Sequence, residues 1–129
     1  MIVAVLTGFY NKLVTYSGSY GTYQIKAPQS ASLPYVTFGL ETDRPMGTFA
    51  SQEAMEDLTF WVNVFSETST ASVATVADLV FAVMDDATLT VSGYTGMKCV
   101  REFIGSTTWD MDTNTFMLPI RYRVWLDKT

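Results

Sequence analysis

Hydrophobic and polar residues alternate most clearly in two segments of the chain, residues 58–65 and 116–126. Alternate residues of a strand point to opposite faces of a sheet, so each segment is predicted to be a strand with one apolar face. The two apolar faces comprise Leu58, Phe60, Val62, Val64, Phe116, Leu118, Ile120, Tyr122, Val124 and Leu126. The other face of the first strand is mixed and carries Trp61 and Phe65. Such a strand is predicted near the centre of a sheet, with a helix on its apolar side.

Two further segments have apolar residues three and four positions apart, which is the spacing of one helix face. In the N-terminal segment these residues are Ile2, Val5, Leu6, Phe9, Leu13 and Tyr16. In the segment after residue 69 they are Val73, Val76, Ala77, Val80, Phe81 and Met84. Residues 66–69 form a polar turn suited to capping the second helix, and Glu67 adds a negative charge near its positive N-terminus. This helix is predicted to cover the strand that it follows.

Shorter patterns complete the predicted fold. A strand starting at Pro34 fits residues 33–41, because proline is tolerated at the first position of a strand. Residues 20–25 suit a short strand, and residues 97–109 form a terminal antiparallel hairpin with the last strand. Pro119 lacks a backbone donor, so we expect a bulge or a partly free edge there. These patterns predict two main helices and about four to five strands in a single domain over residues 1–129.

Residues 42–55 separate the two central strands and contain Pro45, Gly47 and charges of both signs. They are predicted to form a long loop or an extended hairpin arm. A segment of this length without structure of its own is uncommon in a small domain, and it is usually functional or disordered. We expect a partner to order it, with Met46, Phe49 and Met55 as anchors. A mobile, solvated loop is the alternative.

Composition and charge narrow the classes of protein. The chain has 129 residues, 48% of them hydrophobic, which suffices for one core. Lys and Arg number 8 against 13 Asp and Glu, and the net charge of -5 argues against a surface that neutralises nucleic-acid phosphates. The single cysteine, Cys99, cannot form an internal disulfide, which favours assembly in the cytoplasm. Asn11 and Lys12 interrupt the apolar N-terminus too early for a membrane span, and no membrane association is expected.

Few residue types suited to catalysis are present. The chain has no histidine, so imidazole ligands and imidazole acid-base chemistry are excluded. The acidic pairs at residues 85–86 and 110–112 are explained better by turns than by a metal site, since the glycine and terminal glutamate of a calcium loop are missing. Cys99 is predicted to be a buried small hydrophobic residue. We therefore expect a protein that is not an enzyme, with no catalytic residue, metal or cofactor.

The order of these segments resembles the tail-terminator, or tail-completion, proteins of long-tailed bacteriophages and gene-transfer particles. The likeness covers about residues 1–126 of the printed chain. It rests on a strand entry at Pro34 and Tyr35 and on a central strand ending at residues 64–66 before a helix. The third feature is the pattern Arg121, Tyr122, Arg123 in the last strand.

The resemblance implies an α+β subunit with a mixed or antiparallel sheet and the two main helices packed on one face. It also implies a structural virion protein that forms a hexameric ring. Such a ring caps the head-proximal end of the tail tube, stops its polymerisation once the tape-measure protein has set the length, and joins the tail to the head connector. The implied partners are other copies of the chain, the tail tube protein, the head-closure protein and the tape-measure protein. DNA would pass through the lumen without specific binding, and assembly would take place in the host cytoplasm.

A ring of this kind needs contacts between two different patches of neighbouring subunits. One candidate patch is the segment 43–55, with Asp43, Arg44, Met46, Phe49 and Met55. The other is the mixed face of the central and last strands, with Trp61, Phe65, Arg121, Arg123 and Trp125. Arginine and aromatic residues are enriched at interface centres. The alternative is that the tryptophans belong to the core and that the arginines pair with acids such as Glu102 on a solvated face.

Two other classes of function remain open from the sequence. One is a different neck or tube component, such as a head-closure protein or a tube subunit, and a tube subunit would stack ring on ring. The other is a small ligand-binding or enzymatic α+β domain. That class requires a pocket with converging polar groups, and the acids and tyrosines of the sequence are not spaced to form one.

Overall fold

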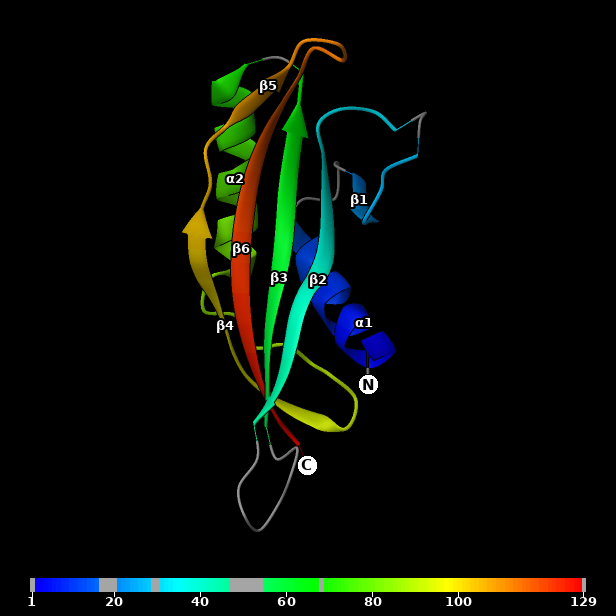
Figure 1. Cartoon of the computed structure of the whole chain (residues 1–129), viewed down its shortest axis with the longest axis vertical. Helices are drawn as coiled ribbons and strands as arrows, with labels where there is room; N and C mark the ends of the chain where they lie inside the picture. Colours follow the sequence, from blue (N-terminus) through cyan, green and yellow to red (C-terminus); the bar gives the residue numbers. More distant parts are fainter. Residues whose placement is uncertain (1, 17–20, 29–30, 47–54, 68, 129) are drawn as a thin grey trace.

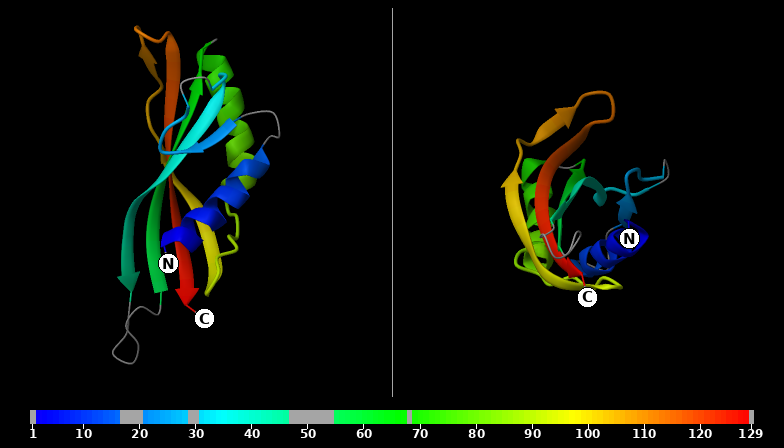
Figure 2. Two further views of the ribbon diagram at one scale, coloured as in Figure 1. Left: turned by 90° about the vertical axis from the view of Figure 1, so that its right-hand side faces the viewer. Right: turned by 60° about the horizontal axis from the view of Figure 1, so that its bottom comes forward.

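The computed structural model describes residues 2–16, 21–28, 31–46, 55–67 and 69–128. One curved sheet carries two helices on the same face (Figures 1 and 2). The N-terminal half contains α1 (Ile2–Leu13), a 3-10 turn (Val14–Tyr16), β1 (Gly21–Gln24), β2 (Tyr35–Met46) and β3 (Met55–Ser66). The C-terminal half contains α2 (Thr70–Met84), β4 (Tyr94–Ile104), β5 (Thr108–Asp110) and β6 (Thr115–Lys128). The predicted α+β class is confirmed.

The described part of the chain forms one six-stranded sheet in the order β1-β2-β3-β6-β4, with β5 also paired to β6. β1 runs parallel to β2, and the other pairs are antiparallel. The sheet is therefore mixed and has slightly more strands than predicted. β3 lies between β2 and β6 and pairs with β6 along its full length, from Met55 opposite Asp127 to Ser66 opposite Phe116. The predicted central position of this strand is confirmed.

The core lies between the sheet and the two helices. Phe9 of α1 stacks on Phe60 of β3 with ring centroids 4.0 Å apart, and its centroid is 5.6 Å from that of Phe38 in β2. α2 buries Val73, Val76, Ala77, Val80 and Met84. The predicted apolar faces of the helices and strands supply most of this core, while Leu6, Phe81 and Phe116 are only partly buried. Core packing thus holds both helices against one sheet face.

The turn between β3 and α2 is fixed by serine side chains. Ser69 is the N-cap of α2, and its hydroxyl accepts a hydrogen bond from the Ser72 backbone N–H at 3.2 Å. The Ser66 and Ser72 hydroxyls lie 2.7 Å apart and are hydrogen-bonded. The cap satisfies a backbone donor that has no partner inside the helix, which explains why the helix begins here. The predicted capping turn is confirmed.

The segment between the two central strands is an extended hairpin arm at its base. β2 and β3 remain paired as far as Met46 opposite Met55, so residues 42–46 and 55 of this segment belong to the strands. The register of β2 shifts between Leu40 and Thr42, which is the signature of a β-bulge. Residues 47–54, including the predicted anchor Phe49, lie outside the described residues. In Figure 1 the C-terminal end of β2 and the N-terminal end of β3 lie toward the bottom of the molecule.

Pro119 interrupts one side of the last strand. The carbonyl of Pro119 accepts a hydrogen bond from the Gly105 N–H at 2.8 Å, so the backbone of Pro119 faces β4 and β5. Proline has no N–H to return this bond. β4 ends at Ile104 and β5 begins at Thr108, which leaves residues 105–107 opposite the proline. The predicted gap in the ladder is confirmed, and the predicted terminal hairpin is divided into two paired pieces.

Candidate interaction surfaces

The sheet face that points away from the helices brings five predicted interface residues together. They are Trp61 and Phe65 of β3 and Arg121, Arg123 and Trp125 of β6, and all five are partly exposed. Trp61 lies opposite Arg121 in the register of the two strands, and Phe65 lies opposite Met117. We call this surface the open face. The sequence pattern predicted its members because strand residues alternate between faces.

Arg123 is held on the open face by a two-pronged ion pair with Asp57. Its Nε donates to Oδ1 at 2.9 Å and its Nη2 donates to Oδ2 at 2.8 Å. These hydrogen bonds and the negative charge of Asp57 raise the pKa of the Arg123 guanidinium above its ordinary value. The Asp57 side chain is only 8% exposed, so the pair satisfies a carboxylate with little access to water. The Arg123 guanidinium carbon also lies 5.7 Å from the ring centroid of Trp125.

Arg121 makes a similar arrangement with Glu41. Its Nη2 donates to Oε1 at 2.9 Å, and its Nε lies 2.8 Å from Oε2. The β2 bulge places Glu41 within reach of β6, two strands away. The Arg121 guanidinium carbon is also 4.6 Å from the ring centroid of Phe103 in β4. The acids that pair with the two arginines are Glu41 and Asp57, in place of the predicted Glu102, which lies exposed at an irregularity in β4.

Aromatic rings continue along the upper part of the open face. Tyr23, Tyr35 and Phe65 come from three adjacent strands, and their successive ring centroids are 5.9 and 5.1 Å apart. Beside Tyr35 and Phe65 lies a hollow of about 360 Å³, whose other lining residues are Thr108, Asp110, Thr113, Thr115 and Met117. Apolar rings bordered by polar groups are typical of a surface that another protein contacts.

The base of the arm is continuous with the open face. Arg44 of β2 lies opposite Asp57 of β3, the residue that holds Arg123. Asp43, Met46 and Met55 also lie in paired strands. The structure thus places four of the five predicted arm residues on the sheet that carries the open face. Phe49 lies outside the described residues.

Three of the four acidic residues in the pairs 85–86 and 110–112 have protein partners. The Tyr122 hydroxyl donates to Asp85 at 2.9 Å, and Arg101 lies 3.6 Å from the same carboxylate. Asp86 lies 3.5 Å from Lys98. Asp110 accepts the Asp112 backbone N–H at 3.0 Å within a turn. Within the described ranges, no group of three or more cysteine and acidic residues is placed to hold a metal ion.

Cys99 is fully buried, as the sequence predicted. Burial raises the pKa of its thiol to about 12, and the negative charges of Asp85 and Asp86 act in the same direction. The thiol is therefore protonated at neutral pH and fits the interpretation of a small hydrophobic residue. Neither described helix combines the length and apolar character needed to cross a membrane.

Sequence reasoning missed one set of surface residues. Among the side chains that the structure describes, the large exposed hydrophobic ones are Val3, Tyr10, Ile25, Phe103, Ile104, Trp109 and Met111. The sequence pattern predicts Trp109 at the end of a strand and Met111 in a turn, and it does not indicate that either side chain is exposed. Hairpin turns usually carry polar residues, so two apolar side chains at this turn are the sequence feature that could have indicated an exposed apolar surface.

Comparison with known proteins agrees with this architecture. A model of the family described as Tail completion protein gp17 matches residues 12–127. The search of curated proteins found no match. One similar solved structure is a chain of the virion of a native gene transfer agent particle, with a TM-score of 0.79 and 14% identity, covering 97% of this chain and 96% of that one.

A second solved structure, described without a function, has a TM-score of 0.70 and 14% identity. The match covers 98% of this chain and 94% of that one. At these identities the two structures establish a shared fold, whereas the family match is specific and spans most of the sequence. The chain therefore belongs to the Tail completion protein gp17 family and is a structural protein of the bacteriophage tail.

Proposed function

We propose that this protein forms a hexameric ring at the head-proximal end of the tail tube, stops tube polymerisation and joins the tail to the head connector. The observation that carries the proposal is the family match over residues 12–127. Its partners are other copies of the chain, the tube protein, the head-closure protein and the tape-measure protein. The ring assembles in the host cytoplasm, and its function rests on binding without catalysis.

The shape of the subunit supports a joining role. The paired ends of β2 and β3, which form the base of the arm, lie at one end of the sheet, and the β5–β6 hairpin lies at the other (Figure 1). A subunit with projections at both ends can contact one structure below it and another above it. We assign the arm, with Asp43, Arg44, Met46, Phe49 and Met55, to the tube. We assign the open face, with Trp61, Phe65, Arg121, Arg123 and Trp125, to protein partners within the neck.

The symmetry of a ring explains how weak contacts of one subunit can hold the whole ring on the tube. Six identical subunits on a six-fold tube make each contact six times, and linked contacts raise the overall affinity far above that of one. The arginines of the open face already have acidic partners within the subunit, so they bring no unpaired charge into an interface. The net charge of -5 per chain suits a lumen that repels the DNA backbone and lets it slide.

The decisive experiment combines native mass with imaging. The purified protein is measured by multi-angle light scattering over a range of concentrations and is then imaged by negative stain with purified tail tubes. The proposal predicts a hexamer, or a monomer that becomes a single ring at one tube end. Stacking of many rings would indicate a tube subunit. A protein that stays monomeric and does not bind tubes at any concentration would favour the alternative of a small ligand-binding domain.

A second measurement isolates the role in length control. Tube protein and tape-measure protein are polymerised with and without this protein, and tube lengths are compared. The proposal predicts uniform lengths with it and overlong tubes without it. Uniform tubes in both reactions would contradict the stopping role, even if the protein still bound to tube ends.

A further inference from the structure

The exposed hydrophobic residues fall into two groups on opposite edges of the molecule. Val3, Tyr10 and Ile25 belong to α1 and to the residue after β1. Phe103, Ile104, Trp109 and Met111 belong to β4, β5 and the turn that follows. β1 and β4 are the two ends of the strand order, and Figure 1 shows them on opposite sides. We call these groups the α1/β1 edge and the β4/β5 edge.

The two edges differ in charge. Residues 1–40 contain Lys12 and Lys26 and no Asp or Glu. Residues 94–112, which hold β4, β5 and the start of the turn, contain Glu102, Asp110 and Asp112. The two cations of this range, Lys98 and Arg101, pair with Asp86 and Asp85 within the subunit. The α1/β1 edge is therefore positive and apolar, whereas the β4/β5 edge is negative and apolar. Two copies of the same edge would repel each other, while unlike edges attract.

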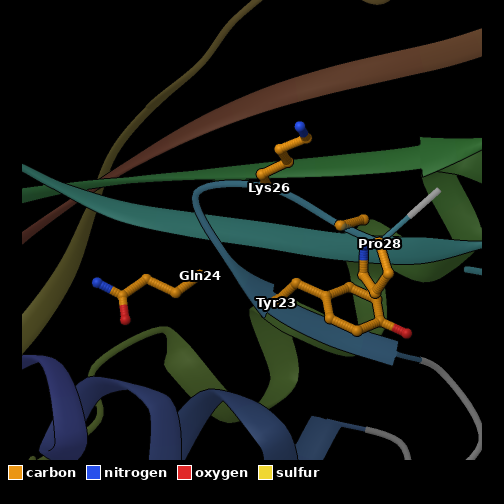
Figure 3. A pocket seen from close by; sticks show the side chains of 5 residues that line it. Tyr23, Gln24, Lys26 and Pro28 are labelled. Atoms are coloured by element: carbon orange, nitrogen blue, oxygen red, sulfur yellow. The ribbon is translucent and has the colours of Figure 1, made fainter.

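The α1/β1 edge is hollowed. A groove of about 360 Å³ is lined by Val3, Leu6, Thr7 and Tyr10 of α1, with Gln24 and Phe38. A second, larger hollow of about 780 Å³ shares Gln24 and is lined by Tyr23, Lys26, Ala27 and Pro28. In Figure 3, Tyr23 lies beside Pro28, Gln24 extends on the α1 side, and Lys26 extends away from it. A cation thus borders concave apolar surface.

The β4/β5 edge projects and is held in shape. The Trp109 indole N–H donates to the Asn114 side chain at 3.2 Å, and its ring centroid lies 6.4 Å from that of Phe116. The Asp110 carboxylate accepts the Asp112 N–H and fixes the turn. Trp109 nevertheless remains 51% exposed and Met111 75% exposed. A fixed side chain loses little conformational entropy on binding, which favours its use as an anchor.

Edge strands of soluble proteins usually carry charged side chains or proline that prevent pairing with other chains. β4 carries the exposed charged residues Lys98, Arg101 and Glu102, but both edges also present large exposed apolar side chains. An apolar surface of this kind indicates an interaction site. We propose that a second copy of this chain covers the β4/β5 edge of the first with its own α1/β1 edge. Repeated around the ring, this head-to-tail contact joins the subunits sideways.

This inference rests on the proposed ring and identifies its subunit contact. It assigns to the two edges the role that the sequence suggested for the arm and the open face. The open face shares Tyr23, Thr108 and Asp110 with the edges, and the rest of it, together with the arm, remains available to the tube and the neck proteins. Because the contact joins unlike edges, the rotation between neighbours decides whether the assembly closes or continues as a helix.

The test uses one variant for each edge. Val3→Asp with Ile25→Asp disables the α1/β1 edge, and aspartate suits the positive backbone angle at position 25, where φ is 66°. Trp109→Asp with Met111→Asp disables the β4/β5 edge. Ala74→Asp, at an exposed position of α2, is the matched control. Circular dichroism and thermal unfolding show whether each variant folds. If the Trp109→Asp, Met111→Asp variant does not fold, the single substitution Met111→Asp is used in its place.

Sedimentation velocity and imaging on tubes then give the result. Each edge variant is expected to lose ring formation, with self-association weakened at least about tenfold, whereas Ala74→Asp forms rings as the unmodified protein does. An equimolar mixture of the two edge variants retains one intact contact, so it should form a heterodimer and nothing larger. Rings from both edge variants, or a mixture that stays monomeric, would overturn the proposed contact.

The controls separate this inference from the proposed function. If the unmodified protein and both edge variants all form rings, the proposed ring stands and only the proposed contact between the two edges is refuted. If the unmodified protein forms no ring in solution or on tubes, the proposed function fails and the edge contact fails with it. Self-association that weakens at high salt would further support pairing of unlike charges.

Discussion

Gly39 of β2 lies directly beneath the indole ring of Trp61, its partner in the register of β3. A β-carbon at position 39 would fall 2.5 Å from Cζ2 and 2.6 Å from Cε2 of that ring. The indole therefore lies against bare backbone, which allows a large side chain to sit half-buried on the open face. A glycine weakens an isolated strand, and here it supports the position of an aromatic residue.

Gly39→Ala is expected to lower the free energy of unfolding by about 1–3 kcal/mol, because the new methyl group displaces a ring held in the middle of the sheet. Urea unfolding followed by circular dichroism measures the change. In a Trp61→Val background the same substitution should cost much less, since the clash is absent. Equal costs in both backgrounds would show that the ring does not cause the effect.

The two arginines of the open face should differ in their contribution to stability. Arg123→Met leaves Asp57, with a side chain only 8% exposed, without its ion-pair partner. Arg121→Met leaves Glu41, which is 36% exposed and can be solvated. We expect the loss of unfolding free energy for Arg123→Met to be at least about twice that for Arg121→Met. Urea unfolding of the two variants under identical conditions provides the comparison.

Asp57→Asn serves as the control for this pair. It removes the negative charge and keeps the size of the side chain, so in combination with Arg123→Met it should recover part of the lost stability. If the double variant is no more stable than Arg123→Met alone, the unpaired carboxylate is not the source of the cost.

Stability should fall in alkaline solution. The pKa of Cys99 rises from 9.0 in the unfolded chain to about 12 in the folded protein, mainly through burial. Below pH 9 the thiol is protonated in both states, so the stabilisation is complete. As the pH rises from 9 toward 12, only the unfolded state loses this proton, and stability falls by up to about 1.4 kcal/mol per pH unit. Chemical unfolding at several pH values measures the slope.

Tyr122 adds to the same loss at higher pH. Burial and its hydrogen bond to Asp85 raise the pKa of this phenol above its ordinary value of 10.0. In Cys99→Ala, the decline should therefore begin near pH 10 instead of pH 9. An unchanged pH profile in this variant would show that the thiol contributes nothing to the decline.

The arm can be shortened without disturbing the sheet. Met46 lies opposite Met55, so replacing residues 47–54 by Asn-Gly would close the two strands with a two-residue hairpin turn. We expect the shortened protein to keep its thermal stability and to lose attachment to tail tubes, measured by co-sedimentation. The matched control replaces residues 47–54 by a glycine-serine segment of equal length. Normal capping of tubes by the Asn-Gly variant would contradict the role of the arm.

Much of the fold was predictable because periodicity reports which face of an element is buried. The alternation in β3 and β6 predicted their core faces, and the spacing in α1 and α2 predicted both helices. Pro119 predicted a gap because a missing N–H is a local property of one residue. The same alternation predicted that Trp61 and Arg121 share a face, and they lie opposite each other in the register of β3 and β6.

The remaining features depend on distances between residues far apart in the sequence. Arg121 meets Glu41 because a bulge in β2 and the pairing order β2-β3-β6 bring them together, and neither follows from the local sequence. The parallel pairing of β1 with β2 likewise depends on where α1 packs. The exposure of Trp109 could not be predicted from the sequence, because a tryptophan in a strand normally belongs to a core.

The pairing of β3 with β6 has a mechanical consequence. These antiparallel strands are bonded over a length of about 40 Å, with the arm at the N-terminal end of β3 and the β5–β6 hairpin at the N-terminal end of β6. Pulling the arm and the hairpin apart draws the two strands past each other along their axes. All the hydrogen bonds between them then bear the load together, instead of opening one after another. Tension applied between the two ends of the subunit is thus resisted by shear along the longest ladder of the sheet.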